Sequence, residues 1–416
     1  MAPSKSGAKG LDLEEALRAY FYQAGYYVAR GVPYRLEGED ITDVDLWLYE
    51  RPAATTRRRM IIDVKNKRSP KATERLIWVK GLQAALAVDG AIVATTDRRE
   101  STRRFARSLG VTLLDGDAVA RLTNSDQLRE PGQFTAEEFD DNVKRIDGSR
   151  RSSDWRDELF ESRSALLHEF GVQSANRNLT AAGYFASQAV GAQPDSRQSE
   201  MACRLSFLAA SMAAISLDFV LAGQAFRPHE EVRSAIVAAI RFGQSEAVSS
   251  LTTVRAAIGL ARAYADNGGA VARQIEQGFL TAAEDIQAEL IADFVSRTST
   301  ADTLFTVARE LQSTAFSVQM AGFDKLSTEA KGYIGVLLDF SKVSRARFAQ
   351  AWSGGAPTQL IRGGTPSARN VPYARSAPRS LSVNEPASPA PKAPTDSPTP
   401  LFDSSGPSQT EPGELG

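Results

Sequence analysis

Hydrophobic and polar residues along 11–122 switch between helical and strand spacing, a pattern typical of a mixed α/β domain. The segment LDLEEALRAYFYQAG, 11–25, carries apolar residues three and four positions apart and ends at a glycine, which predicts a first helix. Three runs rich in β-branched and aromatic residues follow, and they predict consecutive antiparallel strands. These runs span 26–34, 41–50 and 57–67.

The remainder of this region predicts a helix, a short buried strand, a basic amphipathic helix and a last strand. These four elements span 72–89, 90–96, 99–110 and 111–117. The predicted order is therefore helix, three strands, helix, strand, helix, strand, which is an α/β fold class for the N-terminal domain.

Residues 135–352 carry apolar stripes at spacings of three and four, with prolines only at 194 and 228, and predict an all-α accessory domain. The segment 205–226 is apolar and long enough to raise the question of a membrane span. Asp218 in its interior, together with several alanines and serines, favours a helix buried in the helical domain over a membrane span.

Both ends of the chain differ in composition from these two domains. The first ten residues, MAPSKSGAKG, lack an apolar stretch and are interpreted as a flexible arm. Twelve of the 19 prolines lie between Pro357 and Pro412, among serine, alanine, threonine and glycine. Such a composition buries too little apolar surface to offset the entropy of ordering, so the segment 354–416 is predicted to be a disordered tail.

Composition narrows the possible chemistry. The single cysteine, Cys203, excludes an internal disulfide and a cysteine-based zinc site, which favours an intracellular, cytoplasmic protein. The two histidines, His168 and His229, lie far apart in sequence, which argues against histidine metal sites and Ser-His-Asp hydrolysis. The net charge of -1 predicts no overall attraction to polyanions, so any basic surface must be local.

The second and third predicted strands carry polar residues at alternating positions. Because side chains two apart share a face of a sheet, Asp43 and Asp45 lie opposite the row 44, 46, 48, and Asp63 and Lys65 lie opposite the row 60, 62, 64. The two polar rows are expected to meet on one side of the sheet. Asp45 is preferred over Asp43 because it lies deeper within the hydrophobic strand.

Two carboxylates beside a lysine suit the hydrolysis of a phosphodiester. Magnesium is usually held by one or two carboxylates together with water and substrate phosphate, and it lowers the pKa of a bound water. Asp45 and Asp63 are the candidate ligands of Mg²⁺, or of Mn²⁺. Lys65 is placed to orient the water or to neutralise the scissile phosphate, and Glu14 on the first helix is a further candidate carboxylate.

These motifs are a helix-borne glutamate in LEEAL (Glu14), an aspartate in TDVDLW (Asp45) and the Asp-x-Lys of IIDVKNK (Asp63, Lys65). With them, residues 11–122 resemble the restriction-endonuclease-like PD-(D/E)xK nuclease superfamily, and within it the Mrr type. The resemblance implies a core of four mixed strands flanked by helices, with the two aspartates as metal ligands and the lysine as a catalytic residue. The Mrr branch often has Glu or Gln where this chain has Asp63.

Basic residues are more numerous than acidic ones around this core, with 21 lysines and arginines against 16 acidic residues in 1–122. Several follow the candidate site or lie on the basic helix and are expected to contact DNA phosphates. They are Lys67, Arg68, Lys71, Arg103 and Arg104, with Arg98, Arg99 and Arg107 beside them. Trp78 and Phe105 occupy helical core spacing and are expected to pack inside in preference to stacking on bases.

The sequence therefore predicts a magnesium-dependent endonuclease that hydrolyses DNA, and the resemblance implies a role in restriction or defence against foreign DNA. Two alternatives stay open. One is a nuclease for branched DNA or DNA repair on the same fold, and the other is a catalytically inactive nucleic-acid-binding or scaffold protein. The helical domain is expected to serve a homodimer or a protein partner.

Overall fold

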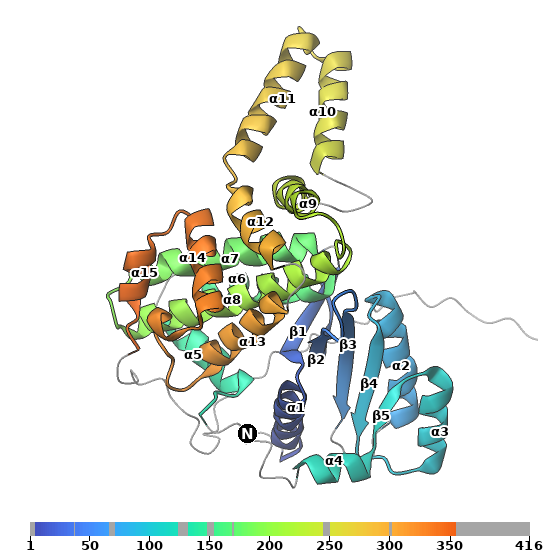
Figure 1. Ribbon diagram of the computed structural model, residues 1–416. Helices are drawn as coiled ribbons and strands as arrows, with labels where there is room; N and C mark the ends of the chain where they lie inside the picture. Colours follow the sequence, from blue (N-terminus) through green and yellow to red (C-terminus); the bar gives the residue numbers. More distant parts are fainter. Residues whose placement is uncertain are drawn as a thin grey trace, which may run out of the picture. The chain divides into compact units, whose positions relative to one another are not determined.

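A five-stranded mixed sheet lies at the centre of the N-terminal region (Figure 1). The structure is a computed structural model, and it describes residues 5–36, 38–65, 71–123, 132–147, 154–168, 170–243, 250–298 and 302–354. The strands are β1 (Tyr27–Leu36), β2 (Glu39–Glu50), β3 (Arg58–Lys65), β4 (Gly90–Thr95) and β5 (Thr112–Leu114), and they lie in this order in the sheet.

The pairing of the strands follows from the connections between them. β1, β2 and β3 form antiparallel neighbours joined by short connections, whereas β4 and β5 add in parallel because a helix precedes each of them. These helices are α2 (Ala72–Ala85) and α3 (Glu100–Leu109), and α1 (Lys5–Gln23) precedes β1. The predicted order of helices and strands is confirmed, and Pro33 is tolerated within β1 because that strand lies at an edge of the sheet.

Two helical segments depart from the predictions. α1 begins at Lys5, so residues 5–10 of the predicted flexible arm are helical, because extending a helix that has already formed costs little compared with starting one. A further helix, α4 (Gly116–Thr123), follows the last strand and was not predicted. The predicted disordered tail lies outside the described residues, apart from Gly354.

One face of the sheet is covered by α1 and α4. Leu13 and Leu17 of α1 pack with Leu46, Ile62 and Val64 in a hydrophobic cluster that also includes residues of β1, β4 and α4. This face corresponds to the apolar rows that the strand periodicity predicted. The odd-numbered positions of β2 and β3 thus point to the opposite face.

The sequence had suggested that this opposite face is polar, but part of it is apolar and buried. Trp47, Tyr49 and Ile61 have at most 1% of their surface exposed, and they belong to a second, larger cluster. α2 and α3 contribute to this cluster, and so does the helical region, where Phe170 contacts both aromatic rings. The prediction of a polar face therefore holds only toward one end of β2 and β3, because the helical region buries the remainder.

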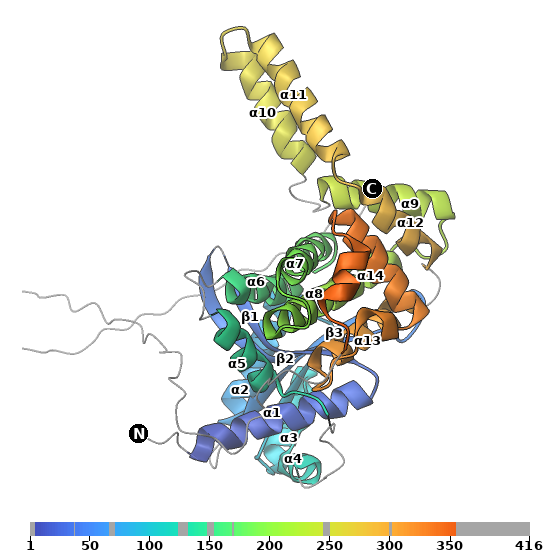
Figure 2. The same ribbon diagram turned by 90° about the vertical axis from the view of Figure 1, so that its left-hand side faces the viewer.

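The helical region contains eleven α-helices within the part of the chain that is described. They are α5 (Ala136–Asp147), α6 (Asp154–His168), α7 (Val172–Gly191), α8 (Arg197–Ala222), α9 (His229–Phe242), α10 (Ser250–Tyr264), α11 (Gly268–Glu284), α12 (Ala288–Arg297), α13 (Thr303–Phe316), α14 (Thr328–Phe340) and α15 (Arg345–Ala351). Figure 2 shows α8 between α7 and α13, and α10 with α11 as a hairpin. The described residues of this region are mostly helical, as predicted.

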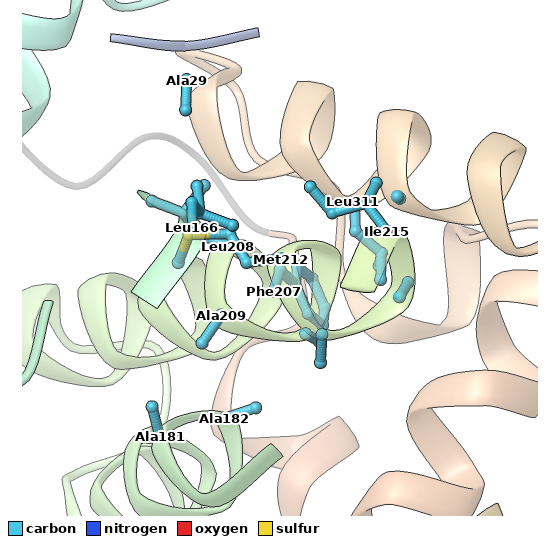
Figure 3. Packing of buried hydrophobic residues seen from close by; sticks show 14 of the residues in the cluster. Ala29, Leu166, Ala181, Ala182, Phe207, Leu208, Ala209, Met212, Ile215 and Leu311 are labelled. Atoms are coloured by element: carbon cyan, nitrogen blue, oxygen red, sulfur yellow. The ribbon is translucent and has the colours of Figure 1, made fainter. Parts of the chain in front are cut away.

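α8 is the central helix of this region. Its Phe207, Met212 and Ile215 lie among side chains of α6, α7 and α13, and small residues such as Ala181 let the helices approach closely (Figure 3). Among the described helices, α8 is the one long and apolar enough to cross a membrane, and 83% of its apolar window is buried inside the protein. The interpretation as a buried core helix, consistent with a soluble protein, agrees with this burial.

Candidate active site

The candidate residues lie where β2 and β3 separate. The pairing of these two strands ends at Leu46 opposite Ile62, although both strands continue beyond this pair. β2 goes on beside β1, with Val44 opposite Val32, and β3 goes on beside β4. We call this separation the fork, and Asp45 and Asp63 are the first residues beyond its last pair.

Asp45 bridges the fork through its side chain. Its Oδ2 atom accepts a hydrogen bond of 2.6 Å from the backbone N–H of Val64, a donor that the strand ladder no longer satisfies. The carboxyl is half-buried, and this burial raises its pKa above the ordinary value, although the Val64 hydrogen bond and the charge of Lys65 act in the opposite direction. Asp45 is therefore a partly desolvated carboxylate held against β3.

Asp63 is 6% exposed and is bound by a residue of α2. Arg75 donates from Nε to its Oδ2 at 2.9 Å and from Nη2 to its Oδ1, which is a bidentate pair. Lys65 places its Nζ 3.8 Å from the Asp63 Oδ1. The charges of Lys65 and Arg75 also act on Asp45, where they oppose the rise in pKa that burial causes, so both carboxylates lie near the same cations.

Glu14 lies at the margin of this group. Its carboxylate accepts a hydrogen bond of 2.9 Å from Nη2 of Arg30, which also binds Glu15 and Glu137. Burial raises the pKa of Glu14, Arg30 opposes this effect, and the charge of Asp45 adds to it. Glu14 is thus within electrostatic reach of Asp45, while its carboxylate accepts hydrogen bonds from the buried Arg30.

The competing aspartate, Asp43, lies farther along β2. It is exposed and faces Pro33 in the β1 register, beyond the point where β2 has left β3. The preference for Asp45 therefore agrees with the geometry of the fork.

The predicted phosphate contacts have different surroundings. Lys67 and Arg68 lie outside the described residues, and the ammonium of Lys71 lies 3.1 Å from the carboxylate of Glu74. Arg103 is bound by acidic side chains that follow β5, with Nε 2.7 Å from the Asp115 carboxylate. Further ion pairs join Arg98 to Asp117, Arg99 to Asp97, Arg103 to Asp117 and Arg107 to Glu100.

These ion pairs change the expectation for the basic helix. Acidic residues within the domain neutralise much of the positive charge of α3, so its arginines are not an uncompensated surface for phosphates. Arg104 is exposed on α3, and its contact with DNA stays a prediction. The amphipathic pattern identified the helix, but it did not reveal which acids would fold against it.

Sequence reasoning missed Arg75 beside the fork and assigned its neighbour Trp78 to the core. Arg75 binds Asp63, and its guanidinium carbon lies 4.1 Å from the ring centroid of Trp78. Trp78 is 37% exposed, so the prediction that it packs in the core is wrong, whereas Phe105 does pack against the core. The i,i+3 spacing of Arg75 and Trp78 was the available signal, since such residues are neighbours on a helix.

The donor set at the fork suits a hard cation with few protein ligands. Within the described ranges, no group of three or more Asp, Glu, His or Cys side chains is placed to hold a metal ion. A magnesium ion often takes only one or two carboxylates, with water and phosphate as its other ligands, and Asp45 and Asp63 meet that requirement. In this structure Arg75 supplies the positive charge that faces Asp63. Its guanidinium must therefore move before one ion can bind both carboxylates.

Comparison with known proteins does not identify a family for this chain. No family model matches it, and neither does any curated protein or solved structure.

Proposed function

We propose that this protein is a magnesium-dependent endonuclease that hydrolyses phosphodiester bonds in DNA, on a restriction-endonuclease-like fold. The observation that carries the proposal is the fork, where Asp45, Asp63 and Lys65 lie together on one side of two separating strands. The topology of three antiparallel strands followed by parallel ones supports the proposed family. The resemblance to Mrr-type domains supports a cytoplasmic role in restriction or defence against foreign DNA.

In this proposal Asp45 and Asp63 hold the ion, and Mn²⁺ is an alternative to Mg²⁺. The bound ion supplies a Lewis acid for the phosphoryl oxygens and a water of lowered pKa. The Lys65 ammonium, already beside Asp63, neutralises charge on the scissile phosphate or orients the water. Glu14 adds negative charge from α1 without being required as a direct ligand.

Arg75 supports one rival function. In a domain that has lost its metal, an arginine would take the place of the ion as a permanent structural partner of the aspartate. The guanidinium that binds both oxygens of Asp63 fits this role as well. Such a protein would bind nucleic acid or act as a scaffold without cleaving. Cleavage assays separate the two functions.

The test is cleavage of supercoiled plasmid by the full chain in Mg²⁺, in Mn²⁺ and in chelator. We expect nicking or linearisation with metal only, and a loss of about 100-fold or more in rate for Asp63→Asn, Asp45→Asn and Lys65→Met. The matched control is Asp43→Asn, which removes a carboxylate from the same strand outside the fork and should retain activity. Failure of the wild type to cleave with either metal, together with metal-independent DNA binding, would favour the inactive scaffold.

A further inference from the structure

The outer surface of α2 exposes an aromatic residue beside the fork. Ile77 is 58% exposed and Trp78 is 37% exposed, whereas the other three tryptophans, at positions 47, 155 and 352, are at most 3% exposed. Gly81 lies one turn further on, and a Cβ atom added there would meet no atom within 4 Å. We call Ile77, Trp78 and Gly81 the Trp78 platform.

The platform is connected directly to the candidate active site. The Arg75 guanidinium lies over the indole of Trp78 and binds Asp63 at the same time. A single side chain therefore separates the indole from a carboxylate of the proposed metal site. Lys65 places its Nζ 3.8 Å from the same Asp63 carboxylate, so the platform begins one side chain away from the proposed position of the phosphate.

We infer that Trp78 stacks an unpaired nucleobase next to the scissile phosphate, so that the preferred substrate is DNA with unpaired bases, such as a flap, a branch or a single-stranded end. Bases within an intact duplex have both faces covered by their neighbours, whereas an unpaired base offers its face to an aromatic ring. The inference rests on the proposed function for the position of the phosphate.

Charge and size favour a nucleic acid strand over a protein partner. Of the cations on α2 and at the residue before it, Lys71 and Arg75 are paired with Glu74 and Asp63. Lys80 is the cation that these two ion pairs leave over, and its charge suits a polyanion. The platform exposes one indole ring and one aliphatic side chain, a surface far smaller than a stable protein interface requires. The open space above Gly81 leaves room beside the ring for a planar base.

The binding test uses the full chain in chelator, so that nothing is cleaved, with a 12-nucleotide oligo(dT) strand and a blunt duplex of the same length as probes. Tryptophan fluorescence should be quenched by oligo(dT) and hardly changed by the duplex, and Trp78→Phe should abolish the quenching because the other indoles are buried. Trp78→Ala should weaken oligo(dT) binding about 5- to 100-fold and leave duplex binding unchanged.

The matched control is Tyr264→Ala, which removes an aromatic ring that is 84% exposed on α10 and should change neither affinity. Equal affinity losses for both probes, or none, would overturn the inference. A change of oligomeric state in Trp78→Ala with unaltered DNA binding would mean that the platform contacts protein, and the inference would be wrong.

The two proposals fail separately. Quenching by oligo(dT) in a protein that never cleaves would leave base stacking intact and refute the nuclease. Metal-dependent cleavage at equal rates on flapped and blunt DNA, without quenching, would support the nuclease and refute the role of Trp78.

Discussion

Asp218 joins the helical region to the sheet, and its removal gives a sharp test of how the two regions hold together. The residue is fully buried on α8 and accepts hydrogen bonds from Tyr49 Oη at 2.6 Å and from Arg51 Nη1 at 3.0 Å. Arg57 adds two more, from Nε at 2.5 Å and from Nη2 at 3.0 Å. The end of β2 and the connection to β3 are therefore anchored to α8 through one carboxylate.

The cost of losing this carboxylate follows from the burial of its partners. The side chains of Arg51 and Arg57 are 5% and 1% exposed, so in Asp218→Ala they would remain as buried cations with a lost counter-ion. Removing one member of a buried ion pair typically costs about 3–5 kcal/mol in the free energy of unfolding. Since a domain is stable by only about 5–15 kcal/mol, this loss is a large fraction of the total.

Urea denaturation followed by circular dichroism measures this effect. The control is Asp339→Ala, which breaks an ion pair with Arg345 whose two side chains are 41% and 51% exposed and should cost less than about 1 kcal/mol. A loss below about 1 kcal/mol in Asp218→Ala would refute the idea that this carboxylate holds α8 against the sheet.

Three further predictions concern single residues. Gly81→Ala should stabilise the protein by about 0.5–1 kcal/mol, seen as a higher Tm, because alanine is the better helix former and meets no neighbour there. Hydrogen bonds from Arg99 lower the pKa of Asp97 to about 2, so Asp97→Ala should cost about 1–2 kcal/mol near pH 7, and urea titrations should show this difference vanishing as the pH falls from 4 to 2. Burial raises the pKa of the Cys203 thiol, so a thiol reagent should label it only in denaturant, and rapid labelling of the native protein would contradict its burial.

Local periodicity was sufficient for the order of elements and for the grouping of the acids. Strand alternation put Asp45, Asp63 and Lys65 on one side because each strand imposes a period of two on its own residues. A carboxylate pair on adjacent strands is thus visible in the sequence once the strands are recognised.

Contacts between distant segments were not visible in this way. The burial of Trp47 and Tyr49 depends on Phe170, more than a hundred residues away, and no local pattern reports such a partner. The neutralisation of Arg103 by acids that follow β5 has the same origin. The exposure of Trp78 also escaped prediction, because apolar spacing on a short helix does not show which face the sheet will cover.

The central claim is that the carboxylates of the fork bind a divalent cation, and manganese binding measures this apart from cleavage. We predict that titration of the full chain with Mn²⁺, with free ion followed by electron paramagnetic resonance, finds a site that is lost in Asp45→Asn and in Asp63→Asn and kept in Asp43→Asn. Binding that survives both substitutions in the fork, or a wild type that takes up no ion with DNA present, would contradict the account.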